Sequence, residues 1–240
     1  MRAIITFHSI DDSGTVLSYP PKLFADLLEA LHESKLPVCD LGTLLSDETR
    51  RGITLTFDDG MRSLFTSALP VIRDHAVPAH LFLTTGAVGG NNRWPTQPAS
   101  APCFDMLNWK EIEGLQAAGV LVEAHTSSHP DLRKLQVEEI AGECNAADEI
   151  IEQRLGRRPQ FFAYPYGYSN ERARNYMGEH YKASVTTELH VLGGNDNRAA
   201  LPRLDSYYLR SPRVFRQLDS GVSRAYLLLR GMMRAIRGSQ

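Results

Sequence analysis

The residues Ile53–Gly60, ITLTFDDG, join an apolar run to two adjacent aspartates and a glycine. The first five of them combine β-branched and large apolar side chains, which predicts a buried strand over Ile53–Phe57. Helical periodicity then predicts a helix from about Met61 to His75. A strand that leads into a helix of this length is the repeating unit of parallel α/β sheets.

The same alternation continues along the rest of the chain. Further strands are predicted at residues 2–7, 79–84, 120–124, 160–163, 183–186 and 201–204, and helices at 21–35, 109–118, 137–155 and 170–180. Seven strands in this order fit a closed or nearly closed α/β barrel in a single domain better than an open doubly wound sheet, which the pattern alone does not exclude. The segment 86–107 is long for a connection in such a fold, so we expect a functional loop over one barrel face.

Charge and cysteine content exclude several classes of protein. With 26 basic and 28 acidic residues among 240, the chain lacks the basic surplus of a nucleic-acid-binding protein. Its three cysteines are too few for a disulfide framework or a four-thiolate zinc site. The N-terminal MRAIITFHSIDD is acidic where a signal peptide is apolar, and no apolar run approaches membrane-spanning length. We therefore expect a cytoplasmic protein.

Asp58 and Asp59 follow the strand of the opening stretch directly. Because neighbouring side chains of an extended chain point to opposite sides, one carboxylate can bind a metal while the other faces a second partner. Burying both charges without a cation or a proton would be costly. The alternative, favoured for this pair taken alone, is a helix N-cap, in which a carboxylate accepts hydrogen bonds from free backbone N–H groups.

A second motif, HTSSHP, carries His125 and His129 at the end of the predicted strand 120–124. If the segment forms a single helical turn, this spacing places both imidazoles on one face. The alternative is a pair of surface or capping histidines. One aspartate and two histidines would supply three ligands of the type zinc prefers and would leave a coordination position open. Both motifs lie at carboxyl ends of strands, where barrel enzymes carry their chemistry.

A third motif, FFAYPYG over Phe161–Gly167, again follows a strand, and taken alone it is best interpreted as a loop whose aromatic side chains pack on the core. In this order and separation, the three motifs resemble those of the polysaccharide deacetylases of carbohydrate esterase family four, the NodB-like domain. The resemblance covers roughly Met1 to Asp205. It implies a distorted (β/α) barrel of about seven parallel strands and metal-dependent removal of acetyl groups from sugars.

The resemblance also implies roles for individual residues. Asp59, His125 and His129 match the metal ligands of the family, and Asp58 matches its general base. The backbone N–H of Tyr166 matches the group that helps the metal to hold the oxyanion. Zn²⁺ suits this ligand set best, although Co²⁺, Ni²⁺ and Fe²⁺ bind similar ligands.

The sequence departs from the family pattern in two places. Many members carry Arg where this chain has Ala163, and many take their general acid from a C-terminal histidine, whereas no histidine follows His190 here. A circularly permuted branch, which resembles the poly-N-acetylglucosamine deacetylases, takes its acid from a histidine at the end of the first strand. His8 matches that position, so we predict His8 as the acid; the alternative is an ordinary histidine at a strand end.

Several further residues are candidates for supporting roles. Arg203 and Asp205 resemble a charged pair on a late strand of the family and are predicted to orient the catalytic carboxylate and the acid histidine, with a strand-edge salt bridge as the alternative. Trp94 in the long loop, together with Pro165 and Tyr168 of the third motif, is predicted to contact the sugar.

The C-terminal segment 220–240 is predicted to form a basic amphipathic helix. From Ala225 it reads AYLLLRGMMRAIRG, and its arginines are Arg224, Arg230, Arg234 and Arg237. Such a helix can lie on a membrane surface. The alternative, which the pattern favours, is a final helix that packs its apolar face on the barrel.

The function predicted from these residues is metal-dependent hydrolysis of acetyl groups from N-acetylated sugars, either polysaccharide or lipid-linked oligosaccharide. Two alternatives stay open. The first is an amidase of the same superfamily that acts on a non-sugar amide or imide. The second is a catalytically silent carbohydrate-binding barrel, against which the retention of Asp58 argues.

Overall fold

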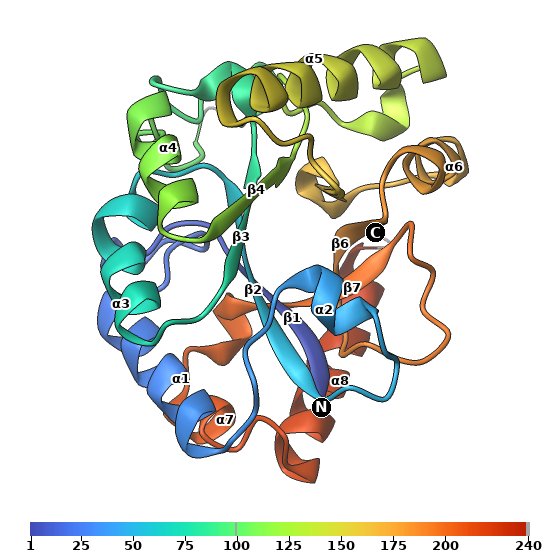
Figure 1. Ribbon diagram of the computed structural model, residues 1–240. Coiled ribbons are helices and arrows are strands. Elements are labelled where there is room, and N and C mark those ends of the chain that lie inside the picture. The colour runs from blue at the N-terminus through green and yellow to red at the C-terminus, as the bar shows by residue number, and fades with distance from the viewer. Residues whose placement is uncertain (99, 239–240) are drawn as a thin grey trace.

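Seven parallel strands form a closed barrel in the computed structural model, which describes residues 1–98 and 100–238, the side chains of 235–238 excepted (Figure 1). The strands follow one another around the barrel in chain order, and β1 closes it by pairing with β7 through Ile5 and Leu204. The closed barrel is confirmed over the open sheet. The strands are β1 (Arg2–Phe7), β2 (Gly52–Asp59), β3 (Ala79–Leu83), β4 (Val120–Ala124), β5 (Phe161–Ala163), β6 (Ala183–Leu189) and β7 (Leu201–Asp205).

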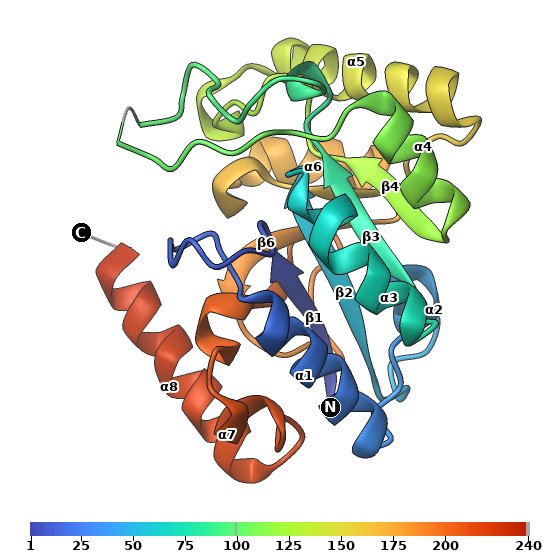
Figure 2. The same cartoon turned by 90° about the vertical axis from the view of Figure 1, so that its left-hand side faces the viewer.

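Helices surround the barrel on its outer face (Figure 2). The bounds of the long helices lie within about two residues of those predicted from the sequence. The helix expected from Met61 begins only at Leu64, with one turn of π-helix over Leu64–Ala68. Two short helices, α2 and α7, were not predicted. The α-helices are α1 (Pro21–Glu33), α2 (Leu41–Leu45), α3 (Leu69–Asp74), α4 (Trp109–Ala117), α5 (Val137–Leu155), α6 (Glu171–His180), α7 (Pro212–Phe215) and α8 (Gly221–Gly238).

The interior of the barrel is apolar at one end and polar at the other. Ile4, Phe82 and Val185 pack inside it with Leu41 and Leu44, so the short helix α2 closes the end at which the strands begin. Toward the carboxyl ends of the strands there are buried polar and charged side chains, which include Asp58, Asp59, His125 and His129 of the first two motifs. Buried charge is expensive unless it is paired, so this end must be held together by specific polar contacts.

The C-terminal segment forms α8, as predicted, and this helix packs along the side of the barrel. Arg237 and the last two residues lie outside the part for which side chains are described. Among the described residues, no helix combines the length and the apolar composition needed to cross a bilayer.

Candidate metal centre and catalytic pocket

The two adjacent aspartates at the end of β2 enter different environments. Asp58 faces Arg203 inside the barrel, whereas Asp59 faces His125 and His129. Asp59 has a left-handed backbone (φ 72°), and Gly60 follows at φ 100°, where an added Cβ would collide with Leu83. Neither aspartate caps a helix, because the next helical turn begins at Leu64 after Ser63. The helix-cap interpretation is therefore wrong.

The histidine motif forms an irregular loop rather than the single helical turn that its spacing allowed. Thr126 (φ 65°) and His129 (φ 58°) both adopt left-handed backbone conformations. Glu143 of α5 holds the loop by accepting hydrogen bonds from the backbone N–H groups of Ser127 at 3.0 Å and Ser128 at 2.8 Å. The predicted helical turn is wrong, but the loop still brings the two imidazoles together, with ring centroids 4.8 Å apart.

Asp59, His125 and His129 form a buried group of three ligand atoms that all lie within 4.8 Å of one another. Oδ1 of Asp59 is 3.2 Å from Nε2 of His125 and 3.4 Å from Nε2 of His129. Nδ1 of His125 donates to the carbonyl oxygen of Ala163 at 2.7 Å, which turns Nε2 toward the centre.

The chemistry of this donor set fits a divalent cation. Oδ1 of Asp59 is buried and accepts no hydrogen bond, which is costly for a carboxylate without a positive partner. Burial alone would raise the pKa of Asp59, but its contacts with the two histidines hold that pKa well below the usual range. Burial also lowers the pKa of His129, which favours the neutral form that binds metals. Asp59, His125 and His129 could therefore hold a divalent cation.

Arg203 of β7 fixes the second carboxylate. Its side chain is fully buried, and its two terminal nitrogens donate to Oδ1 and Oδ2 of Asp58 at 2.7 and 2.6 Å. Nε of Arg203 donates to the carbonyl oxygen of Thr186 at 2.8 Å, and the hydroxyl of Thr56 accepts a further bond at 3.1 Å. Burial would raise the pKa of Asp58, but the guanidinium lowers it, so Asp58 stays ionised.

A cavity of about 280 Å³ opens over these two groups. His8 lies at its edge, half-buried, directly after β1. Asp58, Asp59 and both motif histidines line its inner part, and the loop after β1 and the long loop 86–107 supply its outer walls. The structure thus brings a possible ligand triad, a fixed carboxylate and a further histidine into one solvent-accessible space.

Comparison with known proteins identifies the family. Residues 46–182, more than half of the chain, match the family model described as polysaccharide deacetylase. The chain belongs to the polysaccharide deacetylase family. Among curated relatives, this deacetylase-family chain is 23% identical to YxkH of Bacillus subtilis (strain 168) over 208 residues, which are 84% of this chain and 70% of that protein.

Two further comparisons bear on the branch and the fold. The poly-beta-1,6-N-acetyl-D-glucosamine N-deacetylase of Staphylococcus aureus (strain MSSA476) is 24% identical over 131 residues, which are 51% of this chain and 42% of that protein. Among solved structures, the deacetylase PplD of Streptococcus pyogenes, in complex with acetate, superposes with a TM-score of 0.72 at 21% identity, over 85% of this chain and 91% of that one. This structural likeness supports the fold.

The structure shows what surrounds Ala163, where many family members carry an arginine. In this member of the polysaccharide deacetylase family, Ala163 is fully buried and contributes its carbonyl oxygen to His125. The guanidinium beside Asp58 is that of Arg203, in the barrel interior rather than at the strand edge. Asp205 accepts from the backbone N–H of Tyr207 at 2.9 Å and pairs with an arginine of α8, so its contacts do not join it to His8.

Tyr166 and Trp94 cover the outer side of the metal centre. Trp94 is only 8% exposed and packs on the ring of His129, with centroids 4.3 Å apart. Its Nε1 donates to the hydroxyl of Tyr166 at 3.1 Å, and Thr96 shares a hydrogen bond with the same hydroxyl at 2.6 Å. Tyr166 adopts a left-handed backbone (φ 61°), followed by Gly167, where an added Cβ would collide with Thr187.

The three predicted sugar contacts therefore occupy different positions. Trp94 lines the cavity, whereas Pro165 and Tyr168 do not. Pro165 is buried, and Tyr168 is exposed but covered on one ring face by Arg133 at 3.9 Å. The sequence did not reveal the walls supplied by Leu17 and Gln97. No motif marked those residues, and they line the cavity only because two loops meet there.

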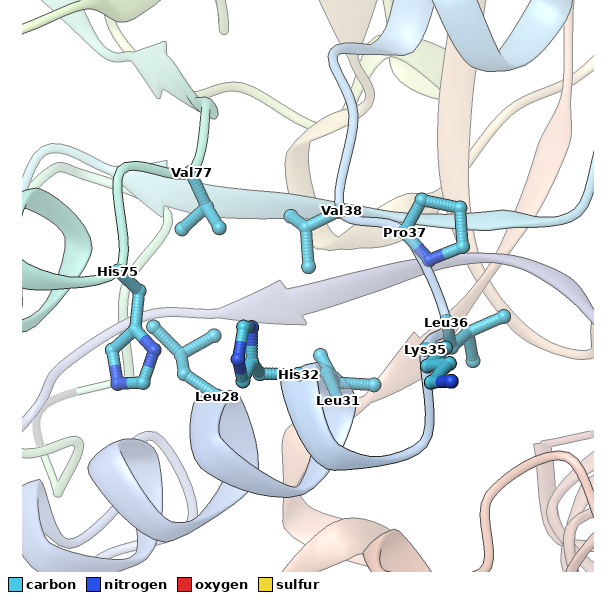
Figure 3. A pocket seen from close by; sticks show the side chains of 9 residues that line it. All are labelled: Leu28, Leu31, His32, Lys35, Leu36, Pro37, Val38, His75 and Val77. Carbon is cyan, nitrogen blue, oxygen red and sulfur yellow. The ribbon is translucent and has the colours of Figure 1, made fainter.

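A second cavity, of about 350 Å³, lies at the opposite end of the barrel (Figure 3). It is bounded by the C-terminal end of α1 and by the segments that lead into β2 and β3, and His32, Lys35 and His75 line it beside apolar side chains. None of its lining residues is acidic, and none belongs to the three motifs. The cavity at the carboxyl ends of the strands is thus the candidate site of this family member.

Proposed function

We propose that the chain is a metal-dependent N-deacetylase of N-acetylated amino sugars. The observation that carries the proposal is the juxtaposition of the triad Asp59, His125 and His129 with the carboxylate of Asp58 in one cavity. The family match supports a deacetylase, and the name of the Staphylococcus aureus relative supports an amide-linked acetyl group on a sugar.

Asp59, His125 and His129 would hold the cation, for which Zn²⁺ is our first choice because the donors are one carboxylate and two imidazoles. When bound, the cation supplies positive charge that polarises a carbonyl oxygen and makes a water molecule more acidic. The hydrogen bond from Nδ1 of His125 to the carbonyl oxygen of Ala163 fixes the orientation of the ring, so that Nε2 is the nitrogen that faces the cation. The backbone N–H of Tyr166 is our candidate for a donor to the oxygen of the reacting acetyl group.

Asp58 would accept a proton from the attacking water. Its ionised state and its fixed orientation both follow from the two hydrogen bonds of Arg203. A general base in position typically contributes about 10²–10⁴-fold to the rate. His8, at the edge of the same cavity, would deliver a proton to the nitrogen that leaves the acetyl group. The two proton-transfer groups would thus approach the substrate from different walls of the cavity.

The proposal is tested by measuring acetate release from β-1,6- and β-1,4-linked N-acetylglucosamine oligomers and from N-acetylated amino acids. We expect release from a sugar, loss on chelation, and a fall of about 10²–10⁴-fold in Asp58→Asn. The matched control is Asp148→Asn, which changes a buried aspartate of α5 outside the cavity and should leave the activity unchanged. Unchanged activity of Asp58→Asn, or release from amino acids only, would contradict the proposal.

The metal content of the variants separates the roles of the two aspartates. Asp58→Asn should bind the cation with wild-type stoichiometry, because the three ligands are intact. Asp59→Asn should lose the cation and the activity together. His8→Ala should retain the cation and lose hydrolysis of amides. If His8→Ala hydrolyses the sugar amide at the wild-type rate, the acid must be another group.

A further inference from the structure

The helix α8 is fixed to the barrel by one of its faces. Ser223 donates to the carbonyl oxygen of Val214 at 3.0 Å, and Leu227 is buried in the main core. At Gly231 the helix backbone approaches the last residue of β6 so closely that an added Cβ would collide with the carbonyl oxygen of Leu189. Arg234 pairs with Asp205 at 3.4 Å. These positions recur every three to four residues, so they define one inward face.

The opposite face of α8 is apolar and exposed. Val222, Ala225, Leu229 and Met232 share it by helical spacing, with Leu228 beside them, and we call these five residues the α8 stripe. The exposed fractions of its four large members range from 41% to 77%. Eight large hydrophobic residues are exposed in the described part of the chain, and four of them lie in the α8 stripe. Apolar surface concentrated in this way marks an interaction site.

The surroundings of the α8 stripe are strongly basic, although the chain as a whole has a net charge of −2. From Ser206 to the C-terminus there are seven arginines and one acidic residue, Asp219. At 100° per residue, Arg224 borders the stripe about 40° from Leu228, whereas Arg230 lies about 80° beyond Val222, past Tyr226 and next to the inward face. Arg224 pairs with Asp219, whereas Arg230 has no acidic partner among the described residues and packs over the ring of Tyr226 at 5.3 Å.

A shallow basic pocket lies beside Tyr226 and Arg230 of α8. Its volume is about 390 Å³, and Arg210, Arg230, Ser211 and three tyrosines line it, without any carboxylate. One of these tyrosines, Tyr207, is a further exposed large side chain. Tyrosine and arginine beside an apolar face are typical of helices that lie at the boundary between lipid headgroups and acyl chains.

The arginines near the α8 stripe favour one type of binding partner over others. Two copies of the chain joined through their α8 stripes would bring two arginine-rich helices together, with no acidic residue on either helix to offset the repulsion. An acidic polymer would pair with the arginines but would leave the apolar α8 stripe exposed to water. We therefore propose that α8 docks the protein on an anionic membrane surface, with the α8 stripe among the acyl chains and Arg230 among the headgroup phosphates.

The position of α8 relates this surface to the catalytic pocket. The helix ends near Asp205, at the carboxyl end of β7, and the candidate site lies at the same end of the barrel. Figure 2 shows α8 on the same side of the molecule as the tips of the long loop and of the loop after β1, both of which wall the pocket. Docking through α8 would therefore hold the mouth of the pocket beside the bilayer.

The test is flotation of the full chain with vesicles of phosphatidylcholine alone or with 30% phosphatidylglycerol. We expect binding to the anionic vesicles only, weakened by salt. Leu229→Glu/Met232→Glu should lower the partition coefficient at least tenfold, and Arg230→Gln about fivefold, as expected for one arginine near the surface. Val137→Glu, which changes an exposed apolar residue on α5, is the matched control and should bind like the wild type.

Circular dichroism and acetate release from a soluble oligomer monitor the fold of each variant, because the substituted side chains point away from the barrel. Equal binding of the wild type to both kinds of vesicle, or unchanged binding of the double variant, overturns the proposal. A wild-type dimer that dissociates in the double variant also overturns it, since that result assigns the α8 stripe to a second copy of the chain.

Discussion

Arg203 and Asp58 form a fully buried bidentate pair, with nitrogen to oxygen distances of 2.7 and 2.6 Å, that joins β7 to β2 across the interior of the barrel. Asp58 immediately precedes Asp59, so the same strand end carries a carboxylate held by a guanidinium and a carboxylate that faces two imidazoles. The guanidinium keeps Asp58 charged and oriented, while Asp59 stays free to bind a cation.

Arg203→Met should destabilise the protein by about 3–5 kcal/mol, because it leaves the charge of Asp58 buried without a partner. The double variant Arg203→Met/Asp58→Asn should recover part of this loss, since it removes the unpaired charge. Chemical denaturation of the wild type, Arg203→Met, Asp58→Asn and the double variant measures the coupling free energy between the two side chains. Additive effects of the two substitutions would show that the pair does not act as a unit.

Addition of Zn²⁺ to metal-free protein should raise the melting temperature. Binding to the folded state alone stabilises by about 2.7 kcal/mol at a free concentration one hundred times Kd. Asp59→Asn should abolish the shift, while Asp58→Asn, which changes the neighbouring carboxylate, should retain it. A shift of equal size in Asp59→Asn would place the cation elsewhere in the protein.

Trp94→Ala should weaken metal binding by about 10–100-fold, because Trp94 packs on His129 and shields the triad from water. Trp94→Phe should lose less, since it keeps the ring contact and lacks only the hydrogen bond to Tyr166. Competition with a metal-binding dye measures the affinities. Trp109→Phe, in α4, is the control. If Trp94→Ala binds the metal as tightly as this control does, Trp94 does not support the metal site.

The strands and the proximity of one aspartate to His125 and His129 could be predicted from the sequence because both depend on local signals, whereas the choice of Asp59 as the candidate ligand came from the family resemblance. Each strand is an apolar run with polar residues at its ends, and Asp59, His125 and His129 lie within two short motifs. The short helices α2 and α7 could not be predicted, since four or five residues contain little periodicity. Their positions depend on packing against the barrel, as the burial of Leu41 and Leu44 illustrates.

The conformation of the site loops depends on tertiary contacts that no pattern of residues reveals. The HTSSH segment is not helical, because Glu143 holds two of its backbone N–H groups from a helix that begins further along the chain. Trp94 becomes buried only when the long loop folds back over His129. The sequence placed Arg203 on a strand, but it did not predict that the side chain lies in the barrel interior. Its partners there come from β2 and β6.

The stability of the protein should depend on pH through Asp148, a group remote from the candidate site. Asp148 of α5 is buried, accepts a hydrogen bond from the hydroxyl of Tyr181 at 3.0 Å and lies 3.3 Å from Arg158. Burial raises the pKa of Asp148 to about 6, above the value of about 3.9 expected in the unfolded chain. The folded state therefore binds this proton more tightly than the unfolded state does.

A raised pKa in the folded state contributes stability that is present below about pH 4 and is lost as the pH rises through about 6. Asp148→Asn, which stays neutral and can still accept from Tyr181, should match the wild type near pH 4 and exceed its stability at pH 7 by about 2–3 kcal/mol. Denaturation at a series of pH values measures the difference, with Glu149→Gln at the adjacent exposed position as the control. If the Asn variant is instead less stable at pH 7, then the ion pair with Arg158 outweighs the cost of burying the charge.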